Sequence, residues 1–79
     1  MKKLHYKGFE IEATPYQLAE TGLWTTHFYI WKHRENSSTN KEFNAANPFG
    51  DREEAIKNCL NFGKKIINGQ YEGYSVEDL

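Results

Sequence analysis

The three histidines of this 79-residue chain are the side chains best suited to chemistry, since imidazole can ligate a metal or transfer a proton. They are His5, His27 and His33, and strand alternation places the first two on one face with Glu10 and Glu12 nearby. Zinc sites usually show tight ligand spacing such as CxxC or HExxH, and the sequence contains neither. We therefore expect cross-strand pairs of histidine with glutamate and no metal site.

The single cysteine, Cys59, is a second candidate, as a nucleophile with a histidine as its base. It lies in the middle of an apolar stripe at helical spacing, where thiols are usually unreactive packing groups. A lone cysteine also forms no internal disulfide, so the fold must be stable without one. We expect Cys59 in the core.

Two further patterns are typical of catalysis or phosphate binding. Glu10 and Glu12 project to the same side of a strand roughly 7 Å apart, a spacing close to that of retaining glycosidases. A chain of this size offers no deep cleft to raise one carboxyl pKa or to hold a sugar. Gly63-Lys64-Lys65 resembles the end of a phosphate-binding loop, but the upstream glycine and the strand-to-helix context are missing. The sequence therefore favours a protein that is not an enzyme and binds no cofactor.

The charge balance is nearly even, with 10 basic and 11 acidic residues and a net charge of −1. This is not the electrostatic footprint of a protein whose affinity comes from phosphates. No apolar stretch approaches membrane-spanning length. The basic start of the chain lacks the apolar run of a signal peptide. We expect a cytoplasmic protein without a membrane, nucleic-acid or small-molecule partner.

The chain begins with a predicted hairpin, because Lys7-Gly8 is a two-residue turn between alternating segments. That turn fixes a register in which apolar residues pair on one face and basic residues meet acidic ones on the other. The expected pairs are Tyr6 with Phe9, Leu4 with Ile11, His5 with Glu10 and Lys3 with Glu12.

Residues 23–33 form the third expected strand, and alternation divides them into two sets. One set is Trp24, Thr26, Phe28 and Ile30, and the other is Thr25, His27, Tyr29 and Trp31. Phe28 and Ile30 carry no polar atom, so the first set faces the core. The second set has polar groups that suit a partly hydrated surface.

The positions of proline, glycine and clustered polar residues predict the loops between the strands. Residues 15–22 are expected to form a loop or a single helical turn, and residues 33–41 a hairpin loop. A short fourth strand over residues 42–45 would turn Phe43 and Ala45 inward. Asn47-Pro48 would then end the sheet with a turn.

A helix from residue 51 is the strongest local prediction. Asp51 suits the N-cap with Glu54 as the partner of a capping box, and Asn68-Gly69 supplies the stop. Gly63 lies inside the apolar stripe, and we expect it to let the helix cross closely over a ring, Phe28 or Trp24. The stripe consists of Ala55, Ile56, Cys59, Leu60, Phe62, Ile66 and Ile67.

These elements predict an α+β fold: an antiparallel sheet of three to four strands with one C-terminal helix packed on one face. Residues 1–69 would form a single domain, and residues 70–79 a tail that is ordered only in part.

The side of the sheet turned away from the helix, here called the open face, is the candidate interaction surface. Its expected residues are His27, Tyr29 and Trp31, with His5, Glu10 and Glu12 beside them. Exposed aromatic rings cluster where something binds, most simply a protein partner or a second copy of the chain. Alternatively, residues 15–22 or the tail with Tyr71, Tyr74 and Val76 cover the rings. A third interpretation is nucleic-acid binding, by base stacking or through Lys57, Lys64 and Lys65.

The stretch "FGDREEAIKNCLNFGKKII" resembles the HicB-type antitoxin domain, a β-β-β-α unit in which a Gly-Asp/Thr turn leads into a helix with Glu-Glu-Ala. The matching residues are Gly50, Asp51, Glu53, Glu54 and Ala55. The resemblance implies a binder of a small ribonuclease toxin. Members of that family often carry a DNA-binding segment after the helix, where this chain has only residues 70–79, so we expect no such segment here. The chain as a whole also looks like small bacterial proteins of unassigned function.

Overall fold

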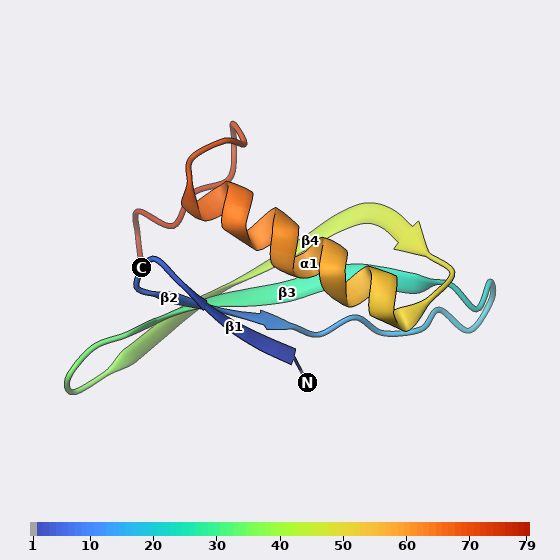
Figure 1. Cartoon of the computed structure of the whole chain (residues 1–79), viewed down its shortest axis with the longest axis horizontal. Helices are drawn as coiled ribbons and strands as arrows, with labels where there is room; N and C mark the ends of the chain where they lie inside the picture. Colours follow the sequence, from blue (N-terminus) through green and yellow to red (C-terminus); the bar gives the residue numbers. More distant parts are fainter. Residues whose placement is uncertain (1) are drawn as a thin grey trace.

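A computed structural model describes residues 2–79, and it gives the side chains of all of these except 46 and 47. Its elements are β1 (Lys2–Tyr6), β2 (Phe9–Ala13), β3 (Trp24–His33), β4 (Ser38–Phe49) and α1 (Arg52–Ile67). The four strands lie side by side in chain order as an antiparallel sheet, and α1 runs across one face of it (Figure 1). The predicted α+β architecture is confirmed.

The β1–β2 turn adopts the conformation that a tight hairpin requires. Lys7 has φ of 48° and Gly8 has φ of 84°, both in the left-handed region typical of type I′ turns. All four predicted pairs form, from Lys3 with Glu12 to Tyr6 with Phe9. The register of the first hairpin was therefore correctly predicted from the sequence.

Alternation along β3 is also as predicted. Phe28, Ile30 and Thr26 are fully buried beneath α1, whereas Tyr29 and Trp31 on the other side are half-buried. The hydrocarbon side chains thus face the helix, and the rings with polar atoms face away from it.

The second hairpin is longer than the sequence indicated. The predicted loop over 33–41 and strand over 42–45 were wrong: β4 spans Ser38–Phe49, and the loop is residues 34–37. The turn expected at Asn47-Pro48 is also wrong, because the strand continues until Phe49 pairs with Trp24. Since β4 is an edge strand, a proline that donates no hydrogen bond is tolerated there. A register shift between Trp24 and Thr26 absorbs the irregularity. Phe43 is buried as expected, and Ala45 is half-buried.

Both ends of α1 lie where the sequence placed them, but the N-terminal capping box does not form. Asp51 is the N-cap in an extended conformation, and its side chain makes no capping hydrogen bond. At the other end Gly69 has φ of 73°. Its N–H donates to Ile66 O at 3.0 Å, and the N–H of Gln70 donates to Lys65 O at 2.9 Å. These two bonds are a complete Schellman motif.

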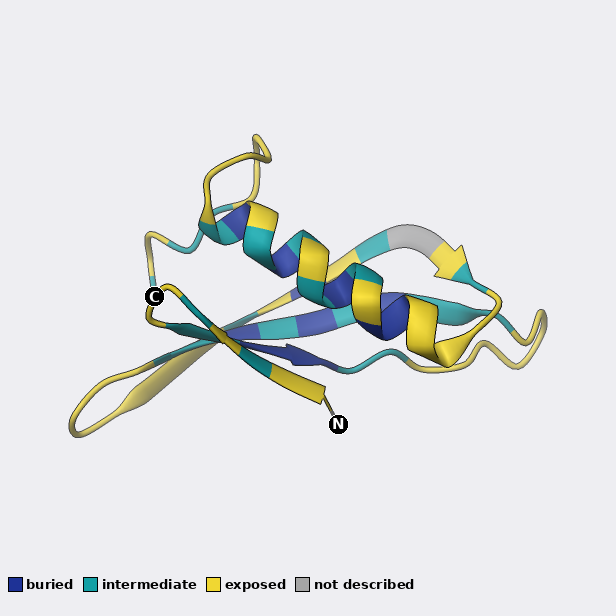
Figure 2. Ribbon diagram, viewed as in Figure 1, coloured by how far each residue is buried: buried dark blue, intermediate teal, exposed yellow. Residues whose placement is uncertain are grey.

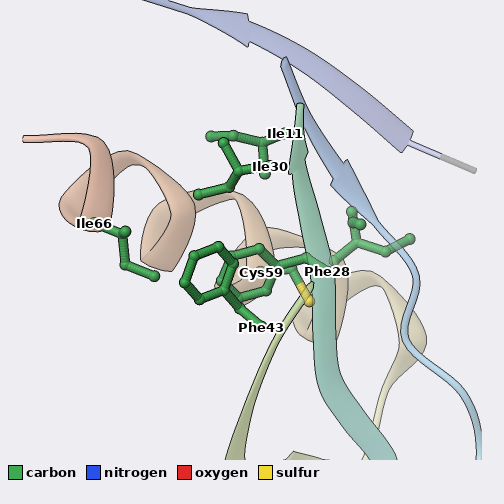
Figure 3. Packing of buried hydrophobic residues seen from close by; sticks show 8 residues of the cluster. Ile11, Phe28, Ile30, Phe43, Cys59 and Ile66 are labelled. Atoms are coloured by element: carbon green, nitrogen blue, oxygen red, sulfur yellow. The ribbon is translucent and has the colours of Figure 1, made fainter. Parts of the chain in front are cut away.

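At Gly63 the backbone of α1 passes close to the sheet. A Cβ at this position would lie 2.8 Å from Cγ2 and 2.9 Å from Cδ1 of Ile11, so only glycine fits without a shift. The predicted neighbour, a ring of Phe28 or Trp24, was wrong because the helix crosses over β2 here. Figure 3 shows the surrounding core, which includes Ile11, Phe28, Ile30, Phe43, Cys59 and Ile66.

Residues 70–79 pack on the same side of the sheet as α1. The rings of Tyr71 and Tyr74 lie 4.7 and 5.5 Å from that of Phe62 between centroids. Lys41 Nζ donates to the backbone oxygen of Ser75 at 3.2 Å, and Val76 and Leu79 pack against the core. In Figure 2 the buried residues form a band between helix and sheet, while the tip of the β3–β4 hairpin is exposed.

Candidate interaction surface

The structure brings the six predicted surface residues together on three adjacent strands. His5 lies on β1, Glu10 and Glu12 on β2, and the remaining three on β3. His5 pairs with Glu10 and Glu10 with Trp31, while Glu12 pairs with Tyr29. The open face also carries Lys3, which the predicted register had already placed beside Glu12, and two titratable residues that the sequence reasoning did not assign to it, His33 and Glu42.

Glu10 lies between two histidines. Its two carboxylate oxygens are 3.2 Å from Nε2 of His5 and 3.1 Å from Nε2 of His33. Since an ionised carboxylate only accepts hydrogen bonds, Nε2 of His33 is the donor in its bond to Glu10, while Nε2 of His5 is within ion-pair distance. The hydrogen bond from His33 lowers the pKa of Glu10, and the nearby Lys3 and His5 add to this effect. Three strands are joined through this one side chain.

Glu12 is buried although no second layer covers this side of the sheet. Only 9% of it is exposed, and its carboxylate accepts a hydrogen bond of 3.0 Å from Nε1 of Trp31. The indole ring of Trp31 stacks in turn on His33, with centroids 5.8 Å apart and planes 6° apart. Side chains of the open face therefore bury one another.

His27 has polar partners on both ring nitrogens. Nε2 bonds to the carboxylate of Glu42, and Nδ1 lies 2.7 Å from the hydroxyl of Thr14. Two aromatic rings flank the imidazole edge-on, Tyr16 with a centroid distance of 5.7 Å and Tyr29 with one of 5.5 Å. The ring is thus fixed in both position and tautomer when it is neutral.

The same arrangement recurs at His33. Its Nε2 bonds to Glu10, and its Nδ1 lies 2.8 Å from the hydroxyl of Ser38. A chain of carboxylate, imidazole and hydroxyl is also found in serine hydrolases, where the geometry lies in a cleft with an oxyanion site. Here both chains lie on the face of a sheet. Two surface hollows lie elsewhere, one lined by Leu18–Thr21 and the other between the end of α1 and the tail.

Neither segment that was expected to cover the aromatic rings lies over Trp31. The tail packs on the helix side through Tyr71 and Tyr74. Of residues 15–22, Tyr16 reaches the open face, at His27. Trp31 donates a hydrogen bond to Glu12 and stacks on His33, both on the open face itself.

The other candidates from the sequence lie apart from this surface. Cys59 is fully buried, where burial raises the pKa of its thiol. Within residues 2–79 no group of three or more His, Cys, Asp or Glu is arranged to hold a metal ion. Lys64 and Lys65, considered for nucleic acid, point in different directions: one ammonium lies over the ring of Tyr6 and the other over Tyr71.

Comparison of the chain with protein-family models, with curated proteins and with solved structures finds no match. Of the helical residues that the structure describes, none belongs to a helix with the length and apolar character needed to cross a membrane.

Proposed function

We propose that this chain is a non-catalytic protein-interaction module of the cytoplasm that self-associates through its open face. The observation that supports the proposal best is one row of residues across the four strands. In it Lys3 pairs with Glu12, Glu12 with Tyr29, and Tyr29 with Glu42. The row begins with a cation on one edge strand and ends with an anion on the other.

Such a row is complementary to itself. When two sheets stack face to face about a two-fold axis parallel to the strands, β1 of one copy lies over β4 of the other. Lys3 then meets Glu42 of the second copy, and this contact occurs twice. Between the two contacts, Glu12 of each copy faces the phenol of Tyr29, which is a hydrogen-bond donor.

The open face also has the size and composition of an interface. The molecule measures 41 × 26 × 16 Å, so a broad face can supply the roughly 800 Å² per partner that a stable contact buries. Trp31 and Tyr29 provide the large amphipathic rings that dominate binding energies. The carboxylates beneath them are already mostly withdrawn from water, with the Glu10 side chain 12% exposed and Glu12 9% exposed. Association therefore adds little to the cost of burying these charges.

Sedimentation equilibrium tests the proposal. We expect the wild type to form a dimer, and Trp31→Ala to weaken it at least tenfold, because a hot-spot truncation costs about 2 kcal/mol or more. Lys3→Glu and Glu42→Lys should each weaken the dimer through like-charge contacts. The double variant should recover most of the loss, since the two charges exchange places.

The matched control is Lys57→Glu, the same charge reversal on the exposed side of α1. It should leave the dimer dissociation constant unchanged. A wild type that stays monomeric at every concentration would refute self-association. A dimer that is indifferent to Lys3 and Glu42 would refute this arrangement of its subunits.

A second candidate is the toxin-binding function implied by the resemblance to HicB-type domains. The observation that favours it is the excess of carboxylates on the open face, where Glu10, Glu12 and Glu42 outnumber Lys3. Such a face suits a basic protein. Co-expression with the product of the adjacent gene, followed by co-purification, tests it. A small basic ribonuclease-like product that co-purifies with the wild type and not with Glu42→Lys would support it.

A further inference from the structure

We infer that the open face is a proton-controlled contact, on which the two copies associate more tightly as the pH falls from 8 to 6. This inference rests on the proposed self-association. All three histidines of the chain lie on the open face. Histidine is the side chain whose ordinary titration falls within this pH range.

Each histidine faces a carboxylate through the same atom. Nε2 of His5 and of His33 approach Glu10, and Nε2 of His27 approaches Glu42. Protonation leaves these bonds in place and converts each into a charge-assisted pair. The contacts with Glu10 and Glu42 are therefore kept in both protonation states.

The Nδ1 atoms of His27 and His33 can also take up a proton without losing a partner. Each faces a hydroxyl, that of Thr14 or that of Ser38. A hydroxyl donates to Nδ1 when the ring is neutral, and accepts from Nδ1–H when the ring is charged. For His27 the backbone oxygen of Thr14, 3.2 Å away, is a second acceptor. Each of these two rings therefore has a hydrogen-bond partner for Nδ1 whether that atom accepts or donates.

The charges that face these histidines come from β1, β2 and β4, and they decide the sign of the effect. Lys3 on β1 is the one cation, and Glu10, Glu12 and Glu42 on β2 and β4 are three anions. With neutral histidines the open face therefore has a charge of −2, and with three charged histidines a charge of +1. The rings of Tyr16 and Tyr29, the other titratable side chains in contact with His27, lie edge-on to it. Arg34, the first residue of the hairpin loop, donates a hydrogen bond to the hydroxyl of Thr39. Thr39 pairs with Lys32 and so lies on the helix face, and Arg34 is not counted with the open face.

Bringing two such faces together at pH 8 brings together two net charges of −2, even though Lys3 of each copy meets Glu42 of the other. Protons taken up by the histidines reduce this net repulsion, so association is coupled to proton uptake. A binding-linked rise of one pKa unit at one histidine corresponds to a factor of ten. Because the two-fold axis repeats every histidine, we expect the dissociation constant to fall roughly 10- to 100-fold between pH 8 and pH 6.

The experiment measures the dissociation constant by sedimentation equilibrium at pH 8, 7 and 6. The proteins are the wild type and the variants His5→Gln, His27→Gln and His33→Gln, singly and combined, because glutamine keeps a donor and cannot titrate. Each substitution should reduce the slope of log Kd against pH, and the triple variant should have none. Lys57→Gln, which removes a charge from the exposed side of α1, should keep the wild-type slope.

NMR titration of the wild-type histidine ring protons provides a measurement that needs no variant. Their titration midpoints should move to higher pH when the protein is concentrated enough to be dimeric. Dimers with equal dissociation constants at pH 8 and pH 6, or tighter ones at pH 8, would overturn the inference and leave the proposed function standing. A wild type that is monomeric at all three pH values would refute both.

Discussion

The two faces of this sheet bury their side chains by different means. On the helix face, Phe28 and Ile30 are fully buried because α1 and the tail cover them. On the open face, Glu12 is almost as well buried without any covering layer, and its carboxylate accepts a hydrogen bond from Trp31. Burial on the helix face thus comes from apolar packing. On the open face, the buried polar groups are stabilised by hydrogen bonds from neighbouring side chains.

This difference indicates which face tolerates substitutions without unfolding of the protein. Apolar packing is close to solid density, so a lost ring leaves a cavity that the neighbours fill only in part. The polar contacts of the open face are exchanged with water when they break, and each contributes modestly to stability. We therefore expect substitutions on the helix face to affect folding, and those on the open face to affect association.

The largest effect should come from two neighbours on β3. Phe28→Ala removes a fully buried ring and should cost about 3–5 kcal/mol, which is comparable to the total stability of a domain this small. Tyr29→Ala, on the open face, should cost about 1 kcal/mol or less while it disrupts the dimer. Urea unfolding gives the first quantity and sedimentation equilibrium the second.

The test is which of the two variants, Phe28→Ala or Tyr29→Ala, loses more stability. If Tyr29→Ala unfolded the protein and Phe28→Ala did not, the assignment of the two faces would be reversed. Loss of the dimer in a folded Tyr29→Ala variant, shown by an unchanged far-UV circular dichroism spectrum, would separate folding from association.

Gly63→Ala should have the next largest effect. Alanine raises helix propensity by about 1 kcal/mol, but its Cβ would lie within 3 Å of two atoms of buried Ile11, and overpacking costs about 1–3 kcal/mol. We expect a net loss of about 1 kcal/mol in the free energy of unfolding. Ile11→Val removes the δ-carbon, so the two substitutions combined should be at least about 0.5 kcal/mol less harmful than their sum.

Gly69→Ala, just beyond the C-terminal end of α1, is the matched control, since nothing lies within 4 Å of a Cβ at that position and the cost there is the positive φ alone. That cost should be indifferent to Ile11→Val. Equal coupling at both glycines would contradict the close approach as the cause.

Local rules were sufficient for much of the fold. The register of the first hairpin follows from Lys7-Gly8, and the faces of β3 follow from alternation around Phe28. Gly69 ends α1 as its conformational freedom suggested. In each case the signal lies within a few residues, so no knowledge of the other elements was needed.

The remaining features depend on contacts between distant segments. Polar composition suggested that residues 33–41 were a loop, because the side chains of an exposed hairpin look like those of a loop. His33 was therefore not assigned to the open face, where it bonds to Glu10 across 23 positions of the chain. The approach of Gly63 to Ile11 depends on where α1 crosses the sheet, which no local pattern encodes. The alternation of side chains over residues 38–45, on both sides of Phe43, was the sequence signal for the longer strand.

A smaller effect is expected from Glu10, and it depends on pH. Because the folded state lowers the pKa of this carboxyl through the His33 hydrogen bond, its contribution is fully present above the ordinary glutamate pKa. It is lost as the pH falls through the lowered value. Glu10→Gln should therefore lose less stability than the wild type between pH 6 and pH 3. We expect a difference of about 0.5–1 kcal/mol, measured by urea unfolding at low protein concentration.

Glu53→Gln, an exposed carboxylate in the first turn of α1, is the comparison that makes the Glu10 result specific. Its unfolding free energy should follow the wild-type pH dependence more closely than that of Glu10→Gln. If the two variants behaved alike, the bond between Glu10 and His33 would contribute nothing to folding.

The smallest expected effect concerns the border of the helix face, where Lys41 Nζ lies 3.3 Å from Asp78. Both side chains are substantially exposed, 39% and 68% respectively, and surface pairs of this kind contribute about 0–0.5 kcal/mol. Asp78→Asn should therefore lower the melting temperature by no more than about 4 °C. Val76→Ala, which removes a partly buried apolar contact of the same tail, should cost more. The opposite result would be that Asp78→Asn made the tail sensitive to limited proteolysis while Val76→Ala did not. An ion pair would then hold this part of the helix face in place. The contrast between a packed face and a hydrogen-bonded face would not apply at this border.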